Sequence, residues 1–423
     1  MRIVRITSVA AATLVISCGR SVVTAPSPAG GTVRAASKPA ARLAPIDALV
    51  PASPATVGMD PELPARIDSI VAVAINEGVA PGAAVAVGRF GRLVHLKGYG
   101  AIDYAAGAPA VDPTTLYDMA SLTKVVATTT AAMILEDEGK LDVSRPVHSY
   151  VPELDAPDKA GITVRQILTH RGGFEAFAPL HRQFRGRAEY LAQINARPLT
   201  SVPGTQMVYS DWDFILMQAV VERITGTTLD AFVASRVFGP LAMSSARFTP
   251  DTADAVLLRH VAVTAMDSVR GLIHGVVHDP NAWAMGGVAG HAGLFASARD
   301  LATFAQMMLN GGTYAGTRIV KQQTLARWTA VQDPTSSRGL GWDTPSAVSS
   351  AGRYFSPRSF GHTGFTGTSI WVDPERSLFV IILSNRVNSH GESTRHTQLR
   401  RDLADAVQSA IHDAPLVDWE ARR

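Results

Sequence analysis

The chain has 423 residues, of which 46% are hydrophobic and 18% charged, a composition that excludes a disordered protein and suits one large domain or two closely packed ones. The 39 Lys and Arg residues exceed the 36 Asp and Glu residues so little that charge gives no indication of a nucleic-acid partner. A single cysteine, Cys18, excludes an intrachain disulfide and a cysteine-based structural zinc site.

Residues 1–17 predict a lipoprotein signal peptide. A basic start precedes an apolar stretch, Ile6–Ile16, that is too short to span a membrane as a mature helix. The tetrapeptide that ends at Cys18 resembles a bacterial lipobox, which implies cleavage before Cys18 and a diacylglyceryl anchor on its thiol. The expected location is therefore the cell envelope, on the periplasmic side or the outer membrane in a Gram-negative cell. An ordinary secretory signal with a chance cysteine is the alternative.

The rest of the chain divides into a tether, a domain and a tail. Residues 18–56 are rich in Ala, Ser, Pro and Gly and predict a flexible tether. Residues 57–415 carry the patterns of a globular domain, and 416–423 are a short tail.

The domain has strand patterns near both ends and helical patterns between them. In chain order we expect a helix over 60–78, a hairpin of strands 82–87 and 93–98, a mainly helical stretch over about 121–290, a helix from Ser297 to Leu309, a hairpin of strands 367–372 and 378–383, and a helix over about 397–412. This order predicts an α+β fold, in which one antiparallel sheet combines N- and C-terminal segments, helices flank it, and a mainly helical subdomain is inserted. The cleft between the two parts is the expected place for a site.

Ser121 and Lys124 are candidate catalytic residues at the start of a helix. The helix is apolar nearly all round and is therefore predicted to be buried. Ser121 lies at its N-terminus, where free N–H groups favour a developing oxyanion, and Lys124 lies one turn further on the same face. A lysine in such a helix must be paired or lose its proton, and either state suits the activation of a serine hydroxyl. A capping serine beside an incidental lysine is the alternative.

Two later segments also carry candidate residues. Tyr209, in Tyr-Ser-Asp at a loop–helix junction, suits proton transfer if a cation lies nearby, and a packing role is the alternative. The segment Phe360–Gly367 contains His-Thr-Gly and several glycines, which indicate a close approach of a ligand to a strand whose N–H could complete an oxyanion hole. A bend or bulge explains the same glycines.

Ser-x-x-Lys, Tyr-Ser-Asp and His-Thr-Gly, in this order, resemble the three active-site motifs of the serine β-lactamase and penicillin-binding-protein superfamily. The spacings between Ser121, Tyr209 and His362 are similar to those of the class C β-lactamase and serine DD-carboxypeptidase branch. The resemblance covers about residues 51–411 and implies the β-lactamase/transpeptidase-like fold.

The resemblance also implies a role for each matching residue. By it, Ser121 is the acylated nucleophile, Lys124 its activating partner, Tyr209 the proton shuttle, the N–H groups of Ser121 and Phe365 the oxyanion hole, and Asp211, His362, Thr363 and Gly364 the substrate-binding residues. We expect no cofactor and no metal.

Two positions depart from the common pattern. His362 stands where many β-lactamases have lysine, and a histidine holds a substrate carboxylate less firmly, with a charge that varies near neutral pH. Asp211 replaces the common Asn, and an ionised Asp accepts hydrogen bonds but cannot donate them to an acyl-amide carbonyl. Both changes weaken the case for an efficient antibiotic-destroying enzyme and leave acyl-enzyme chemistry intact.

Other motifs argue against other chemistries. His274 and His278 have metal-ligand spacing, but Gly275 lies between them and no Glu completes a zincin helix, so we favour loop or cleft-wall histidines. His170 and His291 lie beside glycines and are interpreted as hydrogen-bonded scaffold groups. Neither Gly-x-Ser-x-Gly nor a nucleotide-binding glycine loop is present.

The sequence therefore predicts a lipid-anchored envelope serine hydrolase that acts through an acyl-enzyme on Ser121. Its expected substrates are D-amino-acid peptides of cell-wall type, with β-lactams as related acylating agents. A carboxylesterase on the same fold is the second hypothesis, and a non-catalytic binding lipoprotein is the third.

Overall fold

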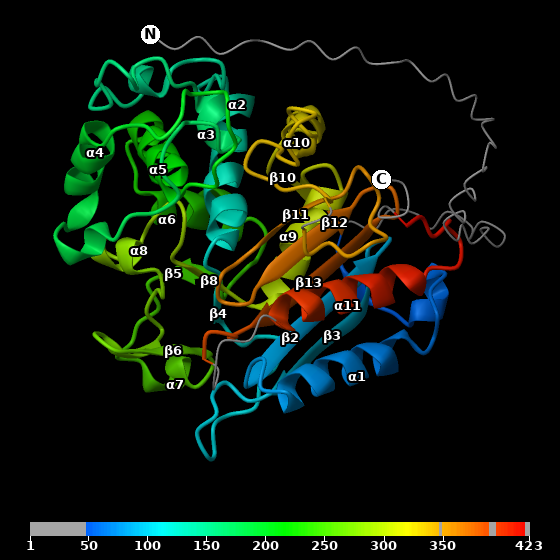
Figure 1. Ribbon diagram of the computed structural model, residues 1–423. Coiled ribbons are helices and arrows are strands. Elements are labelled where there is room, and N and C mark those ends of the chain that lie inside the picture. Colours follow the sequence, from blue (N-terminus) through cyan, green and yellow to red (C-terminus); the bar gives the residue numbers. More distant parts are fainter. Residues whose placement is uncertain (1–47, 347–348, 389–394, 419–423) are drawn as a thin grey trace, which may run out of the picture.

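The computed structural model describes residues 48–346, 349–388 and 395–418 (Figure 1). The predicted signal peptide, Cys18, and most of the predicted tether and tail lie outside the described residues. None of the described helices is long and apolar enough to cross a membrane.

A six-stranded sheet joins the two ends of the domain, which confirms the predicted arrangement. Its strands, in spatial order, are β1 (Val50–Pro51), β3 (Arg92–Gly100), β2 (Gly82–Arg89), β13 (Leu378–Ser384), β12 (Ser369–Asp373) and β11 (Phe360–Thr363). The two predicted hairpins meet where β2 pairs antiparallel with β13, with Val85 opposite Ile382. The pairing of β1 with β3 is parallel, and the other pairings in this sheet are antiparallel.

Each face of the sheet buries its own core, because alternate side chains of a strand point to opposite faces. On β13, Val380 and Ile382 pack with α1 (Leu63–Asn76) and α11 (Arg395–Ser409), which lie side by side across one face (Figure 1). Ile381 and Leu383 face the opposite core, where α9 (Ala298–Leu309) packs against β2, β12 and β13. Burial on both faces explains why β13 is apolar along nearly its whole length.

The predicted helical subdomain is mainly helical and also contains short strands. Its helices are the π-helical turn η2 (Lys124–Thr129), α2 (Thr130–Asp137), the 3-10 turn η3 (Val147–Ser149), α3 (Val164–Leu168), the 3-10 turn η4 (Leu180–Arg182), α4 (Gly186–Ala196), α5 (Asp211–Thr225), α6 (Leu229–Val233), the π-helical turn η5 (Ala234–Phe238), α7 (Ala255–Leu258) and α8 (Pro280–Ala284). Its strands are β5 (Arg247–Phe248), β6 (Val263–Asp267) and β7 (Gly271–His274), which are too short to give a clear period-two pattern. Outside it lie β4 (Tyr117–Asp118), β8 (Leu294–Ala296), β9 (Thr313–Tyr314), β10 (Thr317–Arg318) and α10 (Gln322–Thr329).

Local caps begin the helices that matter for the site. The Ser210 side chain accepts a hydrogen bond from the Trp212 N–H and so begins α5, whose first residue is Asp211. Ser297 caps α9 in the same way by accepting from the Asp300 N–H, as the sequence predicts. The position of Asp211 at the N-terminus of α5 is therefore determined by a local sequence signal.

A buried carboxylate at the end of β4 forms the turn that leads into Ser121. Asp118 Oδ1 accepts from the Ala120 N–H at 2.8 Å, and Oδ2 accepts from the His278 N–H at 2.7 Å. Ala120 has a φ of 44°, a left-handed conformation that is uncommon for a residue with a side chain and needs support from its surroundings. Burial of Asp118 raises the pKa of its carboxyl to about 6. The turn before Ser121 thus depends on a carboxylate that titrates in an unusual range.

Replacing Asp118 by Asn should change the pH dependence of stability. Because the pKa of Asp118 is higher in the folded state than its ordinary value of 3.8, its protonation stabilises the fold below about pH 4, and this contribution is lost as the pH rises through about 6. The amide of the Asp118→Asn variant cannot ionise, so the unfolding free energy of the wild type should fall relative to the variant by on the order of 3 kcal/mol across this window. Urea unfolding of both proteins from pH 4 to 7 measures the difference, and parallel stability curves would contradict the assignment.

Candidate active site

The structure brings Ser121, Lys124 and Asp211 into direct contact, although Asp211 comes from a distant part of the sequence. The Lys124 ammonium lies at the start of η2 and is fully buried. It donates to Ser121 Oγ at 2.9 Å, to Asp211 Oδ1 at 2.7 Å and to the His291 carbonyl at 3.2 Å. All three N–H groups of the ammonium therefore have acceptors.

Two neighbouring side chains determine the charge of Lys124. Burial alone would lower its pKa, but the Asp211 carboxylate and the Tyr209 hydroxyl outweigh burial and raise the pKa above its usual range. Lys124 is therefore a cation in the resting protein. To take a proton from Ser121 it must first give one up, and Asp211 is the carboxylate in contact with it.

Tyr209 lies between two cations, just before α5. Its ring centroid is 4.9 Å from Lys124 Nζ and 5.2 Å from the guanidinium carbon of Arg338. Its ring is also 4.5 Å from the ring of His170 and 5.9 Å from that of His362. The structure thus places the predicted proton shuttle beside the predicted activating lysine, where cation–π attraction holds its ring.

His170 is a scaffold group, as the sequence predicts. Its Nδ1 lies 3.0 Å from Asp213 Oδ2 and accepts from the Ser210 N–H at 3.2 Å. Both side chains are buried, and burial lowers the pKa of His170 and raises that of Asp213, so we interpret them as a neutral pair. This pair fixes the backbone between Tyr209 and α5.

The loop after β11 is bound tightly to the segment before Ser121. Thr366 Oγ1 donates to the Asp118 carbonyl at 2.6 Å, and Thr368 Oγ1 donates to the Met119 carbonyl at 3.0 Å. A Cβ on Gly364 would lie 2.4 Å from the Met119 carbonyl oxygen, so the close approach requires glycine. The predicted His-Thr-Gly glycine is therefore explained by backbone packing beside the site.

The N–H groups of Ser121 and Phe365 are available for an oxyanion. Within the described part of the chain, neither donates a hydrogen bond to another protein group. A backbone N–H without a protein partner needs water or a ligand. The two amides therefore have the hydrogen-bonding capacity that the predicted oxyanion hole requires.

His362 and Thr363 end β11, next to Tyr209. His362 Nδ1 donates to the Thr363 carbonyl at 2.8 Å, which leaves Nε2 as an acceptor that is buried without a partner. Burial, with the charges of Arg338 and Lys124, holds the pKa of His362 well below its usual value. The sequence predicted a charge that varies near neutral pH, whereas the structure gives a neutral imidazole.

Arg338 is a residue that the sequence analysis missed. Its Nε and Nη1 are buried without hydrogen-bond partners, and its ion pair with Asp343 is long, at 3.9 Å. It lies over Tyr209, and its positive charge lowers the pKa of His362. No motif surrounds it, because its place in the site depends on distant backbone contacts, such as the bridge between Asp343 and Gly361 that joins this loop to β11.

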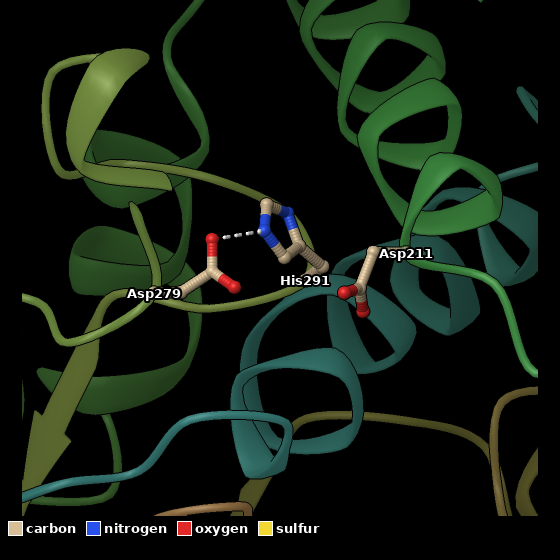
Figure 2. A group of neighbouring side chains, drawn as sticks. All are labelled: Asp211, Asp279 and His291. Atoms are coloured by element: carbon tan, nitrogen blue, oxygen red, sulfur yellow. Dashed lines mark hydrogen bonds and ion pairs between the residues drawn. The ribbon is translucent and has the colours of Figure 1, made fainter. Parts of the chain in front are cut away.

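Asp211, Asp279 and His291 are close enough to share a metal ion (Figure 2). However, His291 Nε2 pairs with Asp279 Oδ1 at 2.9 Å, and Asp211 pairs with the Lys124 ammonium. A divalent cation beside that ammonium would meet strong repulsion, because like charges at such distances repel even in a polar site. We therefore assign the group to charge balance around Lys124, and His291 is a hydrogen-bonded scaffold group, as predicted.

His274 and His278, the pair with metal-ligand spacing, have separate contacts. His274 Nε2 lies within hydrogen-bond distance of the Leu258 and Val261 carbonyls. The His278 ring lies against that of Phe365, with centroids 5.7 Å apart. His274 thus ends strand β7 and is not in a loop, whereas His278 is a loop histidine, as the sequence favours.

Comparison with known proteins agrees with this geometry. The sequence model of the Beta-lactamase family matches residues 67–405. Proteins named "Putative D-alanyl-D-alanine carboxypeptidase" from Salmonella agona (strain SL483) and Salmonella schwarzengrund (strain CVM19633) are 32% and 33% identical over 375 residues, which cover 81% of this chain and 87% of each relative.

Solved structures share the fold. The hydrolase EstCE1 has a TM-score of 0.66 at 21% identity, covering 82% of this chain and 98% of its own. A penicillin-binding protein homologue from Caulobacter crescentus has a TM-score of 0.66 at 19% identity, covering 82% and 99%. A class C β-lactamase has a TM-score of 0.65 at 18% identity, covering 81% and 96%. Because the family match spans most of the domain and the relatives exceed 30% identity, the chain belongs to the Beta-lactamase family and is a serine hydrolase of that family.

Proposed function

We propose that this protein is an exported carboxypeptidase that cleaves D-amino-acid peptides through an acyl-enzyme on Ser121. The observation that carries the proposal is the buried ammonium of Lys124, in contact with both Ser121 Oγ and Asp211. The names of the Salmonella relatives support the peptide substrate.

The contacts support a definite path for the protons. Lys124 passes one proton to Asp211 and takes the Ser121 hydroxyl proton, while Oγ attacks the substrate carbonyl. The N–H groups of Ser121 and Phe365 stabilise the negative charge on the carbonyl oxygen. The hydroxyl of Tyr209 protonates the departing amine and recovers a proton from Lys124. Water then attacks the ester on Ser121 by the reverse path, which releases the acid and restores the hydroxyl.

Arg338 supplies the charge that recognises a terminal carboxylate. Neutral His362 offers only the lone pair of Nε2, which repels a carboxylate, so it cannot replace the lysine of many relatives. Arg338 lies over Tyr209, close enough for its charge to act on His362, and its Nε and Nη1 lack hydrogen-bond partners. A guanidinium is well suited to a carboxylate because it presents parallel N–H donors.

The function is tested by removing the negative charge of the substrate carboxylate or the positive charge of Arg338. Wild-type enzyme should cleave N-acetyl-D-Ala-D-Ala about 10- to 150-fold faster, in kcat/KM, than the same peptide with a C-terminal amide, since a charge-assisted contact contributes roughly 1.5–3 kcal/mol. Arg338→Gln should lose most of this preference, because its kcat/KM should fall for the peptide with a free carboxylate and stay unchanged for the amide. Ser121→Ala serves as the inactive control. Equal losses on both peptides in Arg338→Gln would contradict the role of Arg338, and no cleavage of either by wild type would contradict the peptidase.

A carboxylesterase is the second candidate, because His362 carries no charge for a substrate carboxylate and the EstCE1 hydrolase shares the fold. Short-chain p-nitrophenyl esters distinguish the two. Turnover of these esters that exceeds cleavage of the peptide by orders of magnitude would favour the esterase.

We also propose that Cys18 carries a lipid anchor in the cell envelope, on the grounds of the resemblance to a lipobox. Cys18→Ser should move the protein from the membrane fraction to the soluble fraction of the host cell. Unchanged membrane association of the variant would contradict the anchor.

A further inference from the structure

Arginine and aromatic residues form a continuous stripe that begins at the proposed oxyanion hole, with one contact through the backbone carbonyl of His278. The members of this cation–aromatic stripe are, in spatial order, Arg386, Phe365, His278, Arg270, Trp283 and Arg185. Each is joined to the next by a contact, so the stripe runs from the loop after β11 to α8 and the start of α4.

The first contacts of the stripe involve Phe365, whose N–H is the second proposed donor of the oxyanion hole. Arg386 Nε donates to the Phe365 carbonyl at 2.6 Å, and its guanidinium carbon lies 4.5 Å from the centroid of the Phe365 ring. The same ring lies 5.7 Å from the His278 ring, nearly parallel to it. Phe365 is nevertheless 59% exposed. An exposed aromatic ring next to a reaction centre offers a ligand a large apolar contact area.

The other end of the stripe also pairs arginines with an exposed aromatic ring, that of Trp283. Arg270 Nη2 donates to the His278 carbonyl at 2.6 Å, and its guanidinium carbon lies 5.6 Å from the ring of Trp283. Arg185 lies at the same distance from Trp283, whose side chain is 40% exposed. These separations are within the range of cation–π attraction. The rings therefore present exposed faces beside fixed positive charges.

The positive charges of the stripe exceed the negative ones. Arg270 has a carboxylate partner, Asp267, at 3.6 Å. Among the residues that the structure describes, neither Arg386 nor Arg185 is paired with a carboxylate. Burial lowers the pKa of Arg386, so this guanidinium has lost part of its hydration without gaining a counter-ion. Its Nε fixes Phe365, which leaves both terminal N–H₂ groups for a bidentate partner.

The place of the stripe indicates which part of a substrate it meets. In the described residues no contact joins it to Tyr209, His362 or Arg338, which surround the proposed carboxylate of the leaving group. It starts at the amide that would hold the carbonyl oxygen. The part of the substrate that stays on Ser121, the acyl half, therefore has the stripe as its available surface.

We propose that the cation–aromatic stripe is a subsite for the acyl half of the substrate and selects acyl groups that carry a carboxylate, such as an acidic peptide. Arg386 pairs with the carboxylate, and Phe365 contacts the chain next to it. This inference rests on the proposed function, since it requires a substrate that acylates Ser121.

Two penicillins provide a matched test, because carbenicillin is benzylpenicillin with one added carboxylate on the acyl side chain. The rate of Ser121 adduct formation, by intact-mass spectrometry, is compared for the two drugs, with hydrolysis of the drug measured wherever the adduct turns over. Wild type should react with carbenicillin at least about tenfold faster, as expected for one charge-assisted pair. Arg386→Gln should bring the ratio of the two rates to about one, and Arg386→Lys should keep part of the preference. Added salt should reduce the wild-type ratio.

The control is Arg318→Gln, which removes an exposed arginine on β10 and should leave the ratio unchanged. A wild-type ratio near one, or a ratio that survives Arg386→Gln, would overturn the stripe while the adduct itself still supported Ser121. If Arg386→Gln only displaced the loop that carries Phe365, the adduct would form more slowly with both drugs and the ratio of the two rates would stay as in wild type. That result would also contradict the stripe. No reaction with either drug would contradict the proposed function and the stripe together.

Discussion

The buried ammonium of Lys124 is the interaction on which the rest of the site depends. A charged group without solvent must find a partner for each N–H, and here the three acceptors come from three separate elements. Ser121 lies one turn earlier, Asp211 begins α5, and His291 precedes β8. A shift of any one of these elements would leave a buried charge unpaired. The Lys124 ammonium therefore couples the packing of the helical subdomain to the geometry of the nucleophile.

The charged residues around Lys124 have separate proposed roles in proton transfer and in substrate recognition. Asp211 keeps Lys124 protonated at rest and can hold the proton that Lys124 must release. His291 is held by Asp279, which lets its carbonyl serve as the third acceptor (Figure 2). In our proposals, two arginines recognise anionic groups of the substrate, Arg338 beside Tyr209 and Arg386 beside Phe365. Where the sequence departs from the common motifs, neighbouring residues carry the charges. Arg338 is the cation near the neutral His362, and Asp211 is the carboxylate paired with Lys124.

Most of the fold could be predicted, because strong local signals determine it. The apolar patterns predicted the two hairpins, their places near the two ends of the domain predicted one shared sheet, and the cap at Ser297 predicted the start of α9. Ser121, Lys124 and Tyr209 could be found because each lies in a short motif next to a helix start. Asp118 and Arg338 could not, since their roles depend on distant partners such as His278 and Tyr209. The neutral state of His362 likewise follows from burial and from Arg338, neither of which a single sequence reveals.

The central claim is that Ser121, Lys124 and Asp211 act as one proton-transfer unit. The most direct measurement is the rate of benzylpenicillin adduct formation on Ser121 from pH 6 to 9, by intact-mass spectrometry, in wild type, Lys124→Ala and Asp211→Asn. The wild-type rate should change little with pH, because the proton stays within the Lys124–Asp211 pair, and Lys124→Ala should form no adduct. Asp211→Asn should react slowly near pH 6 and about tenfold faster per pH unit thereafter, as Lys124 loses its proton to solvent. An adduct at another residue, or identical pH profiles for wild type and Asp211→Asn, would contradict the account.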